Sequence, residues 1–298
     1  MSPQKSTIGR LIQSTRLTAT RAAFGTLERL APGLGIRWAT NLWLTVPRFR
    51  GRTPPHIPPG TPFTTTIKNR DIRGTTWGTG PTIYLVHGWG GASSQLLPLV
   101  APLMLKGYKV ITFDALSHGT SDPGELGSRH TTIPEMAAAL TAVAKDRGQP
   151  HAVIAHSAGA SSTFYALRGG LRPSRLVFLA PMAQPTDLTK VFAATLGFGE
   201  RIRTGMTERV ARTAGAPWDD FDLPTQVTRI APPPLLTVHD PADRETRYAD
   251  SVALAKAWPD VELVTVKGLG HWRILRDPDT IARAVEFVTT AETRLKAV

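Results

Sequence analysis

Residues 153–164, VIAHSAGASSTF, decide the fold because they join an apolar strand to a helix through one short turn. Ser157 lies at that turn, with Ala155 and Gly159 two positions to either side. A serine at such a turn needs small neighbours at these positions, since its backbone is strained and other chain segments pass close by. The segment therefore predicts a nucleophilic serine, against the alternative of a serine that caps an ordinary helix.

Short apolar runs that alternate with helical stretches surround this segment on both sides. Strands are predicted at 63–68, 72–77, 82–87, 109–114, 151–156, 175–180, 235–239 and 261–266. Helices are predicted at 93–106, 133–147, 157–167, 245–258 and 277–296. The alternation indicates an α/β fold with a mostly parallel, doubly wound sheet of about eight strands.

Acidic and basic side chains follow two later strands of this sheet. HDPADR at 239–244 offers Asp240 and Asp243, and GLGHW at 268–272 offers His271. Open parallel sheets place their sites beyond the carboxyl ends of the strands, so these groups are expected near Ser157. The order serine, aspartate, histidine along the chain is that of a catalytic triad on this kind of sheet.

A glycine-rich loop, HGWGG at 87–91, directly follows the strand predicted at 82–87. Acyl transfer creates an oxyanion that preorganised backbone N–H groups must meet. Glycines allow the main chain to turn with its amides facing inward. The loop is therefore a candidate oxyanion hole, one strand and one helix ahead of the serine turn.

With these motifs in place, the chain resembles the α/β-hydrolase superfamily over residues 63 to 290 or so. The resemblance rests on HGWGG (87–91), DALSHGTSD (114–122), AHSAG (155–159), HDPADR (239–244) and GLGHW (268–272). It implies Ser157 as nucleophile, His271 as general base, Asp243 as orienting acid and the amides of Trp89 and Ala158 as oxyanion donors, supported by His87, Gly88 and Gly159. Asp240 stands where relatives carry a glycine, which favours Asp243 and leaves Asp240 as the alternative acid.

Three regions are expected along the chain. Residues 1–50 form a basic amphipathic helical extension, 51–62 a proline-rich linker, and 63–298 the hydrolase domain with a small helical lid inserted at 182–229. Residues 1–52 carry nine lysines and arginines against one acid, Glu28, a net charge of +8. Such an arm either rests on an anionic membrane surface or packs on the body through apolar side chains. The apolar candidates for packing are Trp38, Leu42, Trp43 and Phe49.

Composition excludes several classes of site and partner. The chain has 298 residues and no cysteine, so disulfides, thiolate metal sites and a cysteine nucleophile are ruled out. The net charge of +12 lies mostly in the arm, and no nucleic-acid motif accompanies it. We expect no nucleic-acid partner, no metal and no other cofactor, and a cytoplasmic protein with at most peripheral contact to the inner membrane surface. The oligomeric state is not readable from the sequence.

The function predicted from these residues is a serine hydrolase that cleaves a hydrophobic, small-molecule carboxylic ester through an acyl-enzyme. A thioesterase, an amidase or an aminopeptidase would use the same triad. The acidic group Asp219, Asp220 and Asp222 in the lid would hold the substrate amine of an aminopeptidase. A different class is a ligand-binding or membrane-docking protein that keeps the triad without turnover. The aromatic side chains expected either to line an acyl pocket or to pack are Phe192, Phe198, Trp218 and Phe221.

Overall fold

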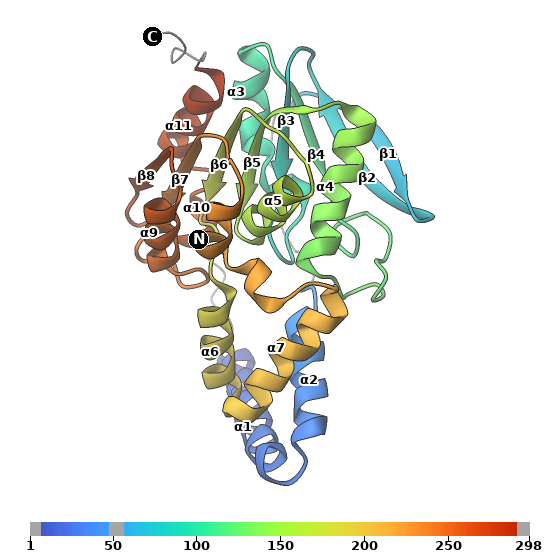
Figure 1. Ribbon diagram of the computed structural model, residues 1–298, viewed down its shortest axis with the longest axis vertical. Coiled ribbons are helices and arrows are strands. Elements are labelled where there is room, and N and C mark those ends of the chain that lie inside the picture. Colours follow the sequence, from blue (N-terminus) through green and yellow to red (C-terminus); the bar gives the residue numbers. More distant parts are fainter. Residues whose placement is uncertain (1–6, 48–56, 291–298) are drawn as a thin grey trace. The chain divides into compact units, whose positions relative to one another are not determined.

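The computed structural model describes residues 7–47 and 57–290, and for residues 7–15 the backbone alone (Figure 1). The described chain divides into two compact units. The helical unit comprises residues up to 44 together with 185–218. The second unit comprises residues 45–184 and those from 219 onward, and is called the hydrolase unit after the domain expected at 63–298. Each unit is built from segments far apart in the sequence, so neither could be delimited by a single boundary along the chain.

An eight-stranded sheet forms the centre of the hydrolase unit, in the order β1-β2-β4-β3-β5-β6-β7-β8 (Figure 1). The strands are β1 (Thr61–Ile67), β2 (Arg70–Trp77), β3 (Thr82–Val86), β4 (Lys109–Phe113), β5 (Pro150–His156), β6 (Arg175–Leu179), β7 (Leu235–His239) and β8 (Val261–Thr265). The pairs β1 with β2 and β2 with β4 are antiparallel, and the other neighbours are parallel. The predicted mostly parallel sheet of about eight strands is confirmed.

Burial along the strands follows their place in the sheet. The central strand β3 reads TIYLV and is buried at every position, as expected for a parallel strand covered on both faces. The edge strand β1 buries only Phe63 and Thr65, in the alternating pattern of a strand with one face toward solvent. The sequence pattern thus places β3 and β5 in the centre, where their carboxyl ends carry the site.

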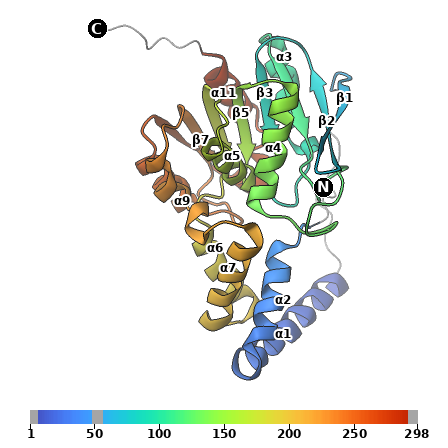
Figure 2. The same ribbon diagram turned by 45° about the vertical axis from the view of Figure 1, so that its right-hand side comes forward.

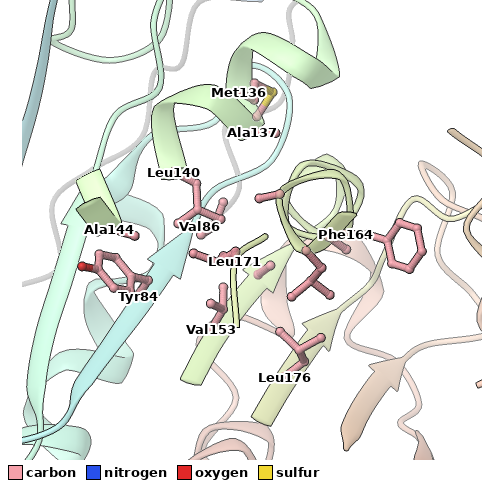
Figure 3. Close-up of a cluster of buried hydrophobic side chains, with 14 of the residues drawn as sticks. Tyr84, Val86, Met136, Ala137, Leu140, Ala144, Val153, Phe164, Leu171 and Leu176 are labelled. Carbon is pink, nitrogen blue, oxygen red and sulfur yellow. The ribbon is translucent and has the colours of Figure 1, made fainter. Parts of the chain in front are cut away.

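Helices cover both faces of the sheet. They are α3 (Val100–Leu105), α4 (Ile133–Arg147), α5 (Ala158–Arg168), α8 (Leu223–Gln226), α9 (Tyr248–Ala257), α10 (Gly270–Arg273) and α11 (Pro278–Thr289). On one face, α4, α5 and α9 bury a core that includes Tyr84, Leu140 and Phe164 (Figure 3). On the other face, α3 and α11 pack on the sheet with Leu103 and Val285. The sheet is therefore doubly wound, as predicted.

Three predicted helices differ from those in the structure. Residues 93–106 form two 3₁₀ turns and the short α3, because Pro98 has no N–H to continue a helix. The helix predicted at 245–258 begins only at Tyr248, because residues 243–246 form a turn that the Asp243 carboxylate caps. Of the helix predicted at 277–296, α11 ends at Thr289, and residues 291–298 lie outside the described chain.

The helical unit contains α1 (Thr7–Leu30), α2 (Pro32–Leu44), α6 (Pro185–Leu196) and α7 (Glu200–Ala214) (Figure 2). Its core is aromatic: the Phe24 ring stacks on Trp38 with centroids 4.2 Å apart and lies 4.9 Å from Phe198. Trp43 meets the edge of Phe192 at 5.3 Å. The amino-terminal helices therefore pack with α6 and α7 in a common core, which agrees with the alternative that the arm packs through its apolar side chains.

The remaining expectations about the arm and linker meet the structure only in part. Trp38, Leu42 and Trp43 pack in the helical unit, whereas Phe49 lies outside the described residues. Most of the linker expected at 51–62 also lies outside them, and β1 begins at Thr61. Among the helices of the described chain, none is long and apolar enough to cross a membrane.

Candidate active site

Ser157 occupies a strained turn between β5 and α5. Its φ is 55°, in the left-handed region that a residue with a side chain rarely adopts. Two close approaches fix the turn. A Cβ on Gly159 would lie 2.6 Å from the carbonyl oxygen of Val86 and 2.7 Å from that of His87, so only glycine fits there. The turn therefore has the geometry that the segment 153–164 predicted.

The HGWGG loop runs directly beside this serine. A Cβ placed on Gly88 would lie 2.8 Å from the Cβ of Ser157, which shows how closely the loop backbone passes the side chain. Gly90 has a φ of 64°, a left-handed conformation that turns the loop. Within the described chain, the amides of Trp89 and Ala158 donate no hydrogen bond to the protein. Both amides are thus free to bind an oxyanion.

Two buried histidines hold the loop in place. His87 Nε2 accepts the N–H of Ala115 at 3.0 Å, so its proton is on Nδ1 and is donated to the carbonyl of Gly88 at 2.8 Å. His118 Nε2 accepts the N–H of Gly90 at 3.1 Å. Burial lowers the pKa of both rings, that of His118 to about 3, and keeps them neutral acceptors. Both rings therefore support the backbone of the loop.

His271 is nearly buried on α10 and faces Asp243. Its Nδ1 lies 2.7 Å from Asp243 Oδ2, a short charge-assisted hydrogen bond. Burial raises the pKa of the Asp243 carboxyl, but hydrogen bonds from His239 and His271 outweigh it and hold that pKa well below its ordinary value. Asp243 is therefore an anion that fixes the proton of His271 on Nδ1 and leaves Nε2 as a base.

Asp240, the alternative acid, points elsewhere. Its Oδ2 accepts the N–H of Gly270 at 2.6 Å and its Oδ1 that of Ala242 at 2.8 Å. Burial raises the pKa of its carboxyl, but these backbone donors lower that pKa by more than burial raises it. Asp240 is therefore ionised. Asp240 ties the end of β7 to the loop that carries His271, and Asp243 is the aspartate that contacts the imidazole.

The site also contains residues that the motifs did not single out. His156 Nε2 bonds to the carbonyl of His271 at 3.0 Å, and burial lowers the pKa of its ring to about 3. Glu245 Oε2 lies 3.8 Å from His271 Nε2, and its other oxygen accepts the indole N–H of Trp272. His239 lies behind Asp243. His239 is the last residue of β7, and residues at the carboxyl ends of parallel strands commonly lie at the site. This position is the feature of the sequence that indicates His239 as a site residue.

A profile of the alpha/beta hydrolase family matches residues 83–284. The chain belongs to the alpha/beta hydrolase family. A curated relative, a non-heme haloperoxidase from Rhodococcus erythropolis, is 30% identical over 179 residues, which are 55% of this chain and 62% of that protein. The chain thus matches less than two thirds of that relative's length.

Solved structures share the fold of this family member at low sequence identity. Est1E from Butyrivibrio proteoclasticus, with ferulic acid bound, is 18% identical, with a TM-score of 0.55 over 76% of this chain and 96% of that one. A membrane phospholipase A described as a bacterial virulence factor is 17% identical, with a TM-score of 0.58. The latter match covers 95% of this chain and 99% of that one, so it extends into the helical unit. The α/β-hydrolase fold expected from the motifs is confirmed.

Most of the aromatic and acidic side chains expected in the lid have partners within the protein. Phe192, Phe198 and Trp218 belong to the aromatic core of the helical unit, so packing accounts for them. Asp220 pairs with Arg168 at 3.2 Å, and Asp222 caps α8 through the N–H of Thr225. In the described parts of the chain, no group of acids and histidines is arranged to hold a metal.

Proposed function

We propose that this hydrolase cleaves a hydrophobic carboxylic ester through an acyl-enzyme on Ser157. One observation carries the proposal: the strained serine turn lies against the backbone of Gly88, while Asp243 holds the imidazole of His271 at 2.7 Å. Nucleophile, base, orienting acid and oxyanion donors thus come from the carboxyl ends of β3, β5, β7 and β8. This combination is the one that acyl transfer requires.

In the proposed mechanism, His271 Nε2 takes the hydroxyl proton of Ser157 while Oγ attacks the ester carbonyl carbon. The amides of Trp89 and Ala158 donate hydrogen bonds to the resulting oxyanion. When the tetrahedral intermediate collapses, the bond to the alcohol oxygen breaks and the alcohol leaves with the proton from His271. Water then loses a proton to His271, adds to the acyl carbon, and releases the acid as Ser157 regains its hydroxyl proton.

An aminopeptidase is the weaker enzyme alternative. It needs a free carboxylate to bind the substrate amine, and the acidic group of the lid would have to supply that carboxylate. Asp220 is engaged by Arg168, and the Asp222 carboxylate caps α8 and accepts a hydrogen bond from Gln184. The exposed Asp219 is the remaining acid of the group, whereas an ester or thioester needs no carboxylate at all.

We test the proposal with nitrophenyl esters of graded acyl length, beside an acyl thioester and an aminoacyl anilide. Wild type should cleave the esters, and the Ser157→Ala variant should lose about 10⁴-fold to 10⁶-fold in kcat. A fluorophosphonate probe should label wild type and leave Ser157→Ala unlabelled. A folded wild type that the probe does not label would favour the non-catalytic ligand-binding alternative.

We also propose that the amino-terminal arm contacts an anionic membrane surface, which makes a lipid ester the second candidate substrate. The observation that favours it is the turn between α1 and α2, where the side chains of Leu30 and Leu34 are 81% and 59% exposed. The exposed Arg29 and Arg37 flank these leucines. Exposed leucines can insert into the membrane interface, while neighbouring arginines are attracted to anionic lipid headgroups.

Vesicle co-sedimentation separates this contact from a purely structural arm. Vesicles containing phosphatidylglycerol should bind the full chain, less so at high salt, and vesicles of phosphatidylcholine alone should not. The double variant Leu30→Ser, Leu34→Ser should lose this binding. Leu105→Ser is the matched control, because Leu105 is 87% exposed but lies on α3 of the hydrolase unit. If both variants lose vesicle binding equally, or if binding does not depend on salt, the arm has only a structural role.

A further inference from the structure

A second histidine contacts the same carboxylate oxygen as His271. His239, the last residue of β7, is fully buried, and its Nε2 lies 3.3 Å from Asp243 Oδ2. We propose that His239 is a positioning residue that donates a hydrogen bond to Asp243 and thereby sets how strongly Asp243 acts on His271. The inference rests on the proposed function, since it assigns a regulator of the basicity of the base in that mechanism.

The proton positions follow from the neighbours of His239. Asp243 is ionised and can only accept, so the ring nitrogen that faces it, Nε2, must carry a proton. The opposite nitrogen, Nδ1, lies 2.7 Å from the hydroxyl of Ser251, which is fully buried on α9. In the neutral ring Nδ1 is an acceptor, so Ser251 donates to it. Ser251 thus selects the tautomer of His239 that can donate to Asp243.

The two oxygens of Asp243 are held by different groups. Oδ1 accepts the backbone N–H of Glu245 at 2.7 Å and that of Thr246 at 3.1 Å, which fix the carboxylate to its own turn. Oδ2 faces His271 at 2.7 Å, the Thr246 hydroxyl at 3.1 Å and His239 at 3.3 Å. Each donor draws negative charge from the oxygen that His271 contacts. Removing the His239 donor should therefore strengthen the attraction between Asp243 and a protonated His271.

The other charged or titratable groups around the two histidines do not replace this donor. Glu245 faces the far nitrogen of His271 at 3.8 Å, and the ring of His156 lies 4.6 Å from that of His271. Asp240 binds the backbone of Gly270, and Tyr248 meets the His239 ring edge-on at 5.8 Å. On α9, Asp250 lies next to Ser251 in the chain and 3.7 Å from Arg247. None of these side chains contacts the Asp243 carboxylate, whereas His239 lies 3.3 Å from it.

The experiment measures the rate of fluorophosphonate labelling as a function of pH in three full-length proteins. In wild type the rate should rise as His271 loses its proton. In His239→Leu, which keeps bulk and removes the donor, the midpoint should move upward by about half a unit to one unit and the plateau rate should fall about tenfold. In His239→Gln, whose amide N–H can replace the Nε2 donor, the midpoint should stay near that of wild type.

Ser251→Ala is the second test and leaves the buried ring in place. Without the serine hydroxyl, His239 is free to place its proton on Nδ1, so the midpoint should move in the same direction as in His239→Leu. Circular dichroism confirms that each variant is folded. The proposal is overturned if the folded His239→Leu and Ser251→Ala proteins both show the wild-type midpoint. Absence of labelling in wild type would instead refute the proposed function.

Discussion

The two units of this protein are stabilised by different kinds of side chain. The chemistry that each unit can carry out differs for that reason. The hydrolase unit buries aliphatic strands under helices and also buries ionisable groups, among them His87, His118 and the side chain of Asp243. The helical unit buries an aromatic cluster around Phe24 and, in its described residues, contains no histidine. Buried ionisable groups need hydrogen-bond partners, and the loops at the edge of the parallel sheet supply them to both ring nitrogens of His87 and of His118. The comparison teaches that the chemistry belongs to the sheet, while the helical unit supplies packing and surface charge.

The strongest test of this comparison changes one carboxylate in each unit. Asp243→Asn should lower kcat by about 10⁴-fold, because His271 loses the acceptor that fixes its tautomer. Glu28→Gln in the helical unit should leave kcat unchanged. The Glu28 carboxylate accepts the N–H groups of Gly199 and Arg201 at 3.0 and 3.2 Å and so caps α7.

Asp240→Asn is the control within the hydrolase unit. Asp240 reaches His271 only through the backbone of Gly270, so we expect a loss of about tenfold, from a displaced loop. Steady-state kinetics on a nitrophenyl ester measure all three variants. A larger loss in Asp240→Asn than in Asp243→Asn would reverse the assignment of the acid.

Acid should destabilise the hydrolase unit before the helical unit. His87, His118 and His156 are buried as neutral rings, with pKa values lowered from 6.5, to about 3 for the latter two. Below pH 6.5 the unfolded chain binds protons that the folded chain does not, so stability falls as the pH falls toward 3. With the two groups at about 3, His118 and His156, the slope is about 3 kcal/mol per pH unit near pH 5, and His87 adds to it in the same direction.

Urea unfolding at a series of pH values measures this slope. His118→Asn removes one of the two groups with a pKa of about 3 and should reduce the slope by at most about half. Hydrogen-exchange protection factors at pH 7 and pH 5 then locate the effect: protection should decline in β3 to β6 and persist in α2 and α7. An equal decline of protection in both units would show that the buried histidines do not make the hydrolase unit more sensitive to acid than the helical unit.

The sequence predicted the hydrolase unit much better than the helical unit, for a physical reason. Each strand of the sheet can be recognised from a local apolar run. The serine turn can be recognised from the small residues within two positions of Ser157. The partners of α1 and α2 are roughly 150 to 175 residues away in the chain, and no local pattern identifies them. His239 was overlooked for a related reason: its neighbour Ser251 lies on the next helix, and the contact needs the folded loop between them.

Packing in the helical unit should be sensitive to its aromatic centre. Phe24→Ala removes a ring that is 0% exposed and stacks on Trp38, so it should cost the unit about 3 to 5 kcal/mol. Hydrogen exchange should speed up in α2, α6 and α7, whose side chains share this core. Labelling of Ser157 should persist, because none of the triad lies in that core. Global unfolding of the variant would show that the hydrolase unit depends on the helical unit for its stability.

The smallest expected effect concerns the crossing of α2 and α7, which two glycines bring close together. A Cβ on Gly205 of α7 would overlap Cδ1 of Ile36, and a Cβ on Gly35 of α2 would overlap Cδ1 of Ile202. The two sites differ in what can move. Ile36 is only partly buried, so its side chain can turn toward solvent, whereas Ile202 is 0% exposed in the aromatic core.

Gly205→Ala should therefore change the free energy of unfolding by less than about 1 kcal/mol, since the helix propensity gained offsets the displaced Ile36. Gly35→Ala should cost about 1 to 3 kcal/mol, because Ile202 has no free volume to enter and the two helices must separate. Urea unfolding followed by the fluorescence of Trp38 and Trp43 reports on this unit. Equal costs at the two sites would mean that both helices shift as rigid bodies, and that the burial of the facing isoleucine does not decide the outcome.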